Sequence, residues 1–150
     1  MAGLTKIPHP FIAVECTVSI YAPIKEVFDR WLRVEDFPSF MEGVREICWL
    51  NPRRFSLKSE NDGQFYHSLC ELTLAIPERR MAWRTIEGPD SSGVACFQNA
   101  GGGFTDLTLK MRYDAEDGWQ NREQVEQRMR RNLDRFKQLV ESSRPVVQEA

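Results

Sequence analysis

Six segments with strand character follow one another between residues 44 and 114, and only short turns separate them. They span 44–50, 53–60, 64–76, 80–87, 92–98 and 104–114, and the breaks carry turn-forming residues in NPRR, ENDG, PERR, GPDSSG and NAGGG. Because connections this short join neighbouring antiparallel strands, we expect a sheet built from successive hairpins. The alternating stretch AVECTVSIYA near the N-terminus adds a seventh strand. A sheet of seven strands curls, because each strand twists.

Helical patterns occur at only two places, after the first strand and after the last. Residues 22–47, APIKEVFDRWLRVEDFPSFMEGVREI, predict two short helices, because Pro38 interrupts the apolar periodicity. Residues 121–143 predict one long helix with a single apolar stripe: Val125, Met129, Leu133, Phe136 and Val140. We expect this stripe to cross the concave face of the sheet and the short helices to close one end. One helix cannot fill such a trough, so a pocket is expected.

The chain length of 150 residues fits one domain, which we expect at 12–143, between a flexible leader (1–11) and a flexible tail (144–150). A net charge of −2 gives no broad basic surface, so no nucleic-acid partner is expected. No apolar run approaches the ~18 residues of a membrane span, so no stable membrane insertion is expected. Pro8 and Pro10 lie where a signal peptide would have its apolar core. We therefore expect a cytoplasmic protein, of unassigned oligomeric state.

The residues that most often bind metals or form disulfides are scattered. Cys16, Cys48, Cys70 and Cys96 lie in different predicted strands without a CxxC pair, which predicts buried free thiols. The two histidines form no HxxxH or HExxH motif, so no metal site is expected. The stretch AGGGF lacks the GK[ST] of a phosphate-binding loop and predicts a hairpin turn. No cofactor is therefore expected.

Several stretches resemble one protein family. Residues 22–47 resemble the start of the START-like, polyketide cyclase/dehydrase proteins of the Bet v 1-like (SRPBCC) superfamily. IPERRMAWRTIEG, SGVACFQNAGGGFTDLTLKMRYD and NLDRFKQLVE match the same pattern in the same order, so the resemblance covers roughly residues 12–142. It implies an α+β helix-grip fold, in which a curved sheet around a long C-terminal helix encloses an apolar cavity. Members include aromatase/cyclases and coenzyme-Q-binding proteins.

Strand periodicity selects the side chains that face the predicted cavity. In QFYHSLCELTLAI, the inward phase is set by Cys70, Leu72, Leu74 and Ile76. Tyr66 and Ser68 share that phase, whereas His67 and Glu71 point outward; a bulge would exchange the two sets. Tyr66 could orient a ligand by hydrogen bonding, or it could be a core aromatic residue.

On neighbouring strands the inward phase predicts apolar walls from Trp83, Phe97, Leu109 and Met111. Arg84 has the opposite phase and should face solvent, whereas Arg33 and Arg45 are candidates for the pocket mouth. Asn132 is a polar residue inside the apolar stripe of the long helix, where it must find hydrogen-bond partners. It could form a structural hydrogen bond to a strand or to a buried water, or it could contact a ligand. Catalytic residues remain unassigned.

Three functional hypotheses follow, and the state of the cavity separates them. The leading one is binding of a small hydrophobic, aromatic or lipid-like molecule in the cavity. An alternative is an aromatase/cyclase-type enzyme, in which Tyr66 or an arginine polarises the oxygens of a polyketide-like substrate. A second alternative is a protein-interaction or quinone-chaperone module, which a cavity filled with side chains would favour.

Overall fold

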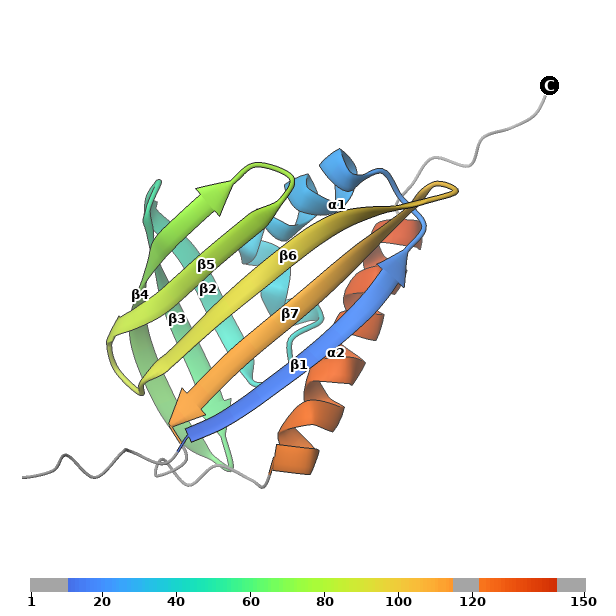
Figure 1. Cartoon of the computed structure of the whole chain (residues 1–150). Coiled ribbons are helices and arrows are strands. Elements are labelled where there is room, and N and C mark those ends of the chain that lie inside the picture. The colour runs from blue at the N-terminus through green and yellow to red at the C-terminus, as the bar shows by residue number, and fades with distance from the viewer. Residues whose placement is uncertain (1–10, 115–121, 143–150) are drawn as a thin grey trace, which may run out of the picture.

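The computed structural model describes residues 11–114 and 122–142, which form a curved sheet and three helices (Figure 1). The elements are β1 (Phe11–Ile20), α1 (Ile24–Trp31), the 3₁₀ helix η1 (Val34–Ser39), β2 (Val44–Asn51), β3 (Arg54–Asn61), β4 (Gln64–Ile76), β5 (Arg80–Glu87), β6 (Ser91–Gly101), β7 (Phe104–Asp114) and α2 (Arg122–Ser142). The seven strands form one antiparallel sheet in the order β1-β7-β6-β5-β4-β3-β2. The predicted α+β helix-grip fold is confirmed.

Alternating burial along the strands defines the concave face of the sheet. In β1 every second residue from Val14 to Ile20 is buried and the residues between them are exposed. On β7, Leu107 and Leu109 are buried in the same way and pair with Val18 and Cys16 of β1. This is the pattern of a sheet with one face on a core and one face in water.

One predicted strand phase is wrong at the end of β4. Leu74 and Ile76 were expected to face inward, but they are 38% and 42% exposed. The pairing between β4 and β5 shifts register between Leu72 and Leu74, so the inward alternation ends at Leu72. Strand β1 begins at Phe11, which pairs with Asp114, one residue before the predicted start of the domain. The rest of the predicted leader, the predicted tail and positions 121 and 143 of the predicted long helix lie outside the described residues.

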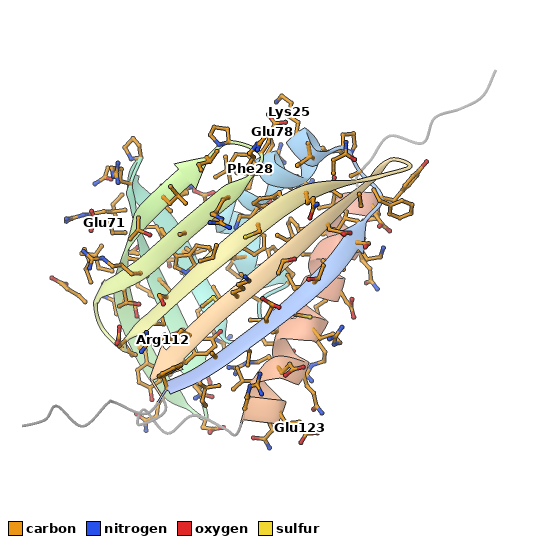
Figure 2. The ribbon with its side chains drawn as sticks, viewed as in Figure 1. Lys25, Phe28, Glu71, Glu78, Arg112 and Glu123 are labelled. Atoms are coloured by element: carbon orange, nitrogen blue, oxygen red, sulfur yellow. The ribbon has the colours of Figure 1, made fainter. Side chains whose placement is uncertain are left out.

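The two short helices differ in type for a reason visible in the sequence. α1 buries Val27, Phe28 and Trp31 on one face, as its apolar spacing predicts. The second helix contains Pro38, which has no N–H to donate to an α-helical bond, and it forms a 3₁₀ helix. Phe28, labelled in Figure 2, packs edge-on against Phe97 of β6 with ring centroids 5.2 Å apart.

The long helix α2 packs along the β1 side of the sheet rather than over its centre (Figure 1). In its C-terminal half, Leu133, Phe136 and Val140 are fully buried. The Phe136 ring lies 5.2 Å from the ring of Trp31 and 5.1 Å from that of Phe40, between centroids. This aromatic cluster holds α2 against both short helices.

The buried Phe136 ring should carry a large share of the folding free energy. We expect Phe136→Ala to lower the free energy of unfolding by about 3–5 kcal/mol, because the ring is fully buried among other aromatic rings. Urea denaturation followed by circular dichroism measures this. Phe104→Ala is the control and should cost far less, because Phe104 is 39% exposed. Equal losses in the two variants would contradict the packing described here.

All four cysteines are free thiols, and each lies in a different strand as predicted. Cys16 and Cys70 are buried, but Cys48 and Cys96 are only half buried, because each alternates with inward-facing neighbours such as Ile47 and Phe97. Thiol titration in denaturant without reductant should therefore count four thiols. A count of two or none would contradict both the structure and a reducing compartment.

Candidate functional site

A cavity of about 190 Å³ lies between the sheet, η1 and the N-terminal half of α2. It exceeds the roughly 150 Å³ of an engineered protein cavity that admits benzene. Val125 and Met129 of α2 line it, whereas Leu133, Phe136 and Val140 of the same helix do not. The cavity therefore occupies the part of the trough that α2 leaves open.

The walls of the cavity are mainly apolar and aromatic. They include Trp31, Val34, Phe37, Ile47, Phe55, Leu57, Met81, Trp83, Leu109, Met111, Val125 and Met129. Such walls favour an apolar ligand, because transfer of apolar surface out of water is favourable.

Six of the seven predicted site residues line this one cavity: Tyr66, Ser68, Trp83, Leu109, Met111 and Asn132. Phe97 is not among its lining residues. Although Phe97 has the inward phase, it lies at the end of the sheet that α1 covers, where it packs against Phe28. Strand phase alone could not place it, because phase gives the face of the sheet and not the position along the trough.

Neutral polar groups lie on two sides of the cavity. Tyr66 and Ser68 come from β4, and Ser59 of β3 pairs directly with Tyr66. Within the described residues, the hydroxyl groups of these three side chains make no hydrogen bond with the protein. They are therefore available to a ligand. Ser59 was missed from the sequence, although the hairpin at ENDG fixes its pairing with Tyr66.

Asn132 joins the long helix to the segment that follows η1. Its Oδ1 accepts a hydrogen bond of 3.1 Å from the backbone N–H of Glu42, and the side chain is buried. Asn132 thus forms a structural hydrogen bond, but its partner lies between η1 and β2 and not in a strand as expected. Its Nδ2 group has no hydrogen-bond partner in the described part of the chain, so this donor is still free for a ligand.

Trp31 is a second residue of the site that sequence reasoning assigned only to the core. It lines the cavity, and its indole N–H is buried without a hydrogen-bond partner among the residues described. A buried donor left without a partner costs about 1–3 kcal/mol. A ligand oxygen that reached this N–H would remove that cost.

Charged residues gather at the edge of the cavity, around Glu42. Arg131 donates to Glu42 from Nε at 2.9 Å, and Arg135 donates from an Nη at 3.2 Å. The hydrogen bond from Arg131 holds the pKa of the Glu42 carboxyl below its usual 4.5, so this group is ionised at neutral pH. Arg45, a predicted candidate for the mouth, pairs with Glu60 close by. Arg84 is exposed, as predicted, and lies 3.9 Å from Glu71.

Burial suppresses the ionisation of two titratable side chains in the cavity lining. Burial raises the pKa of the Tyr113 hydroxyl and of the Cys70 thiol, and both residues line the cavity. Both groups are therefore neutral at pH 7. These two side chains present neutral groups to a ligand, whereas Glu42 and Glu60 form their ion pairs at the edge.

Residues 11–114 and 122–142 contain neither a candidate metal centre nor a candidate membrane-spanning helix. That part of the chain contains no group of three or more His, Cys, Asp or Glu side chains placed to hold a metal ion. None of its helices has the length and apolar character needed to cross a membrane.

Fold and site together define a class of protein: a helix-grip domain that encloses an apolar cavity. The chain belongs to the polyketide cyclase / dehydrase and lipid transport family, whose model matches residues 12–141. An uncharacterized 17.2 kDa protein of Streptomyces lincolnensis is 26% identical over 133 residues, which covers 85% of this chain and 89% of that protein.

Solved structures share the fold at low sequence identity. A START superfamily protein from Mycobacterium smegmatis matches with a TM-score of 0.75 at 13% identity, covering 87% of this chain and 97% of that one. A Deinococcus radiodurans protein matches with a TM-score of 0.70 at 24% identity, over 84% and 95% of the two chains. An aromatase/cyclase from Streptomyces sp. R1128 matches with a TM-score of 0.61 at 17% identity, over 88% and 89%.

Proposed function

We propose that this protein binds a small, neutral aromatic molecule in the cavity between α2 and the sheet. The observation that carries the proposal is the cavity itself, about 190 Å³ of space with largely apolar walls. A domain that served only as an interaction module would have no need of such a space. The four free thiols of this protein suit a reducing compartment, so we also propose a cytoplasmic location.

The lining supports an aromatic ligand with a few oxygen atoms. Trp83 and Phe55 provide flat apolar surfaces, against which another ring can stack or pack edge-on. Tyr66, Ser68 and Asn132 provide neutral hydrogen-bonding groups, which suit a hydroxyl or carbonyl oxygen. The charged residues of the lining lie at its edge: Arg128, Glu42 and Glu60 also border the open hollow beside the cavity, and Asp90 is exposed. An ionic group buried away from that edge would lose its hydration without gaining a partner.

An aromatase/cyclase-type reaction is the second candidate, favoured by the family and by the cavity's neutral donors. Tyr66, Ser68 and Asn132 could polarise carbonyl oxygens of a folded substrate. Cyclisation also requires a group that takes up a proton. Of the acidic residues that line the cavity, Glu42 and Glu60 are already paired with arginines, and Asp90 is exposed to solvent. Binding therefore stands ahead of catalysis.

Filling the cavity should abolish binding. We expect naphthalene and 2-naphthol to bind the wild-type protein and to change its tryptophan fluorescence, because Trp31 and Trp83 line the cavity. Met111→Trp should remove this binding, because the larger ring occupies the ligand's space while the fold persists by circular dichroism.

The matched control is Lys110→Trp, which adds the same ring at the neighbouring, solvent-exposed position on β7. This variant should bind both probes as the wild type does. Unchanged affinity in Met111→Trp, or binding of neither probe by the wild type, would contradict the proposed function.

A further inference from the structure

Trp83 and Met111, which line the cavity, meet over the backbone of Gly93. The three residues lie in one row across the sheet, because Gly93 pairs with Trp83 on β5 and with Met111 on β7. A Cβ atom added at Gly93 would lie 2.4 Å from Cζ2 of Trp83 and 2.5 Å from Sδ of Met111. Both side chains therefore occupy the space that any residue other than glycine would fill.

The need for glycine at this position comes from space and not from backbone conformation. Six other glycines of the described chain have positive φ, but Gly93 does not. An alanine could therefore adopt the same backbone angles, provided that the Trp83 ring and the Met111 thioether moved. The sheet backbone lies on one side of them and the cavity on the other, so movement away from the added Cβ takes them toward the cavity.

We propose that Gly93 sets the size limit of the ligand, an inference that rests on the proposed function. Because Gly93 has no Cβ, the side chains of Trp83 and Met111 can lie directly over its backbone. The cavity above them is therefore deeper than it would be with any other residue at this position. The clashing atoms belong to the Trp83 ring and the Met111 thioether and not to the backbone, so the fold can accept alanine while the cavity becomes smaller.

The test compares two apolar probes of different size. In Gly93→Ala we expect the affinity for naphthalene to fall about 10- to 200-fold, the range for one surplus carbon in an apolar pocket, and the affinity for benzene to fall much less. The double variant Gly93→Ala/Met111→Ala should regain naphthalene binding, because the shorter side chain returns the lost space. Equal losses for both probes, or no recovery in the double variant, would overturn the inference.

Xenon uptake followed by ¹²⁹Xe NMR separates this inference from the proposed function. Xenon enters apolar cavities whatever their natural ligand. If the wild type takes up xenon but binds neither aromatic probe, the proposed function is wrong. Lower xenon uptake by Gly93→Ala than by the wild type would still support the role of Gly93 in setting the cavity size. Equal uptake by both proteins contradicts that role.

A second, more open hollow of about 470 Å³ lies beside the cavity. The cavity and the hollow share seven lining residues: Met41, Glu42, Gly43, Val44, Glu60, Asn61 and Arg128. Residues 41–44, here called the gate segment, follow η1 and end at the first residue of β2. The gate segment is therefore part of the wall between the cavity and the open hollow.

A small set of polar contacts holds the gate segment closed. Glu42 is bound through its carboxylate to Arg131 and Arg135, and through its backbone N–H to Asn132. Gly43 accepts a hydrogen bond of 2.7 Å from the backbone N–H of Glu60. The side chains of Arg131 and Arg135 are 52% and 47% exposed, and ion pairs this exposed are weak. Thermal motion can open such contacts.

We also propose that the gate segment is the entrance for the ligand and that Glu42 is its latch. This inference likewise rests on the proposed function. The carboxylate of Glu42 is bound to two arginines of α2, so these contacts act on the gate segment itself. The latch should therefore govern the rates of ligand entry and exit, and not the affinity.

Stopped-flow fluorescence with naphthalene tests the latch. In Glu42→Gln we expect the association and dissociation rate constants to rise together by about two- to fivefold, with an unchanged Kd. The control Glu87→Gln removes an exposed charge on β5 and should change neither rate. Unchanged rate constants, or a change in only one of the two, would overturn the role of Glu42.

Hydrogen exchange gives a readout that needs no ligand. The N–H of Val44 donates to the carbonyl oxygen of Met41 at 3.2 Å, within the gate segment. In Glu42→Gln the exchange of this amide should accelerate, because the segment opens more often. Accelerated exchange supports the latch even if naphthalene fails to bind, and unchanged exchange contradicts it.

Discussion

The contact of Phe136 with Trp31 and Phe40 is the interaction on which the rest of the architecture depends. It fixes the C-terminal half of α2 against the two short helices. The N-terminal half of α2 then lies over the concave face of the sheet without filling it, and its residues Val125 and Met129 line the cavity. One helix thus plays two roles: half of it completes the core, and the other half forms the roof of the cavity.

The same division explains where polarity is found. Asn132 lies at the boundary between the two halves of α2, where its Oδ1 holds the gate segment and its Nδ2 remains available. The ionised groups around Glu42 lie at the edge of the cavity, where water can solvate them. Inside, the groups are neutral, because burial opposes their charged forms. A cavity built in this way favours a neutral, apolar ligand.

The sequence predicted the topology well, because each strand is bounded by turn residues and alternates in hydrophobicity. It also placed Trp83, Met111 and Asn132 at the cavity, since period and helical phase decide which face a residue occupies. It failed at Leu74, because a register shift is a property of two paired strands. It failed at Phe97, because position along the trough depends on where α1 packs. Gly93 was missed because its role is visible only in the side chains above it.

The central claim is that the space beneath α2 receives an aromatic ring, and the methionines offer the most direct measurement of it. Met41, Met81, Met111 and Met129 all line the cavity, from four different parts of the fold. With ¹³C-methyl-labelled methionine, saturating naphthalene should shift all four methyl resonances through the ring current, whereas cyclohexane should produce much smaller shifts. If naphthalene left these four resonances unmoved, no ring would lie in the cavity, and the account would be wrong.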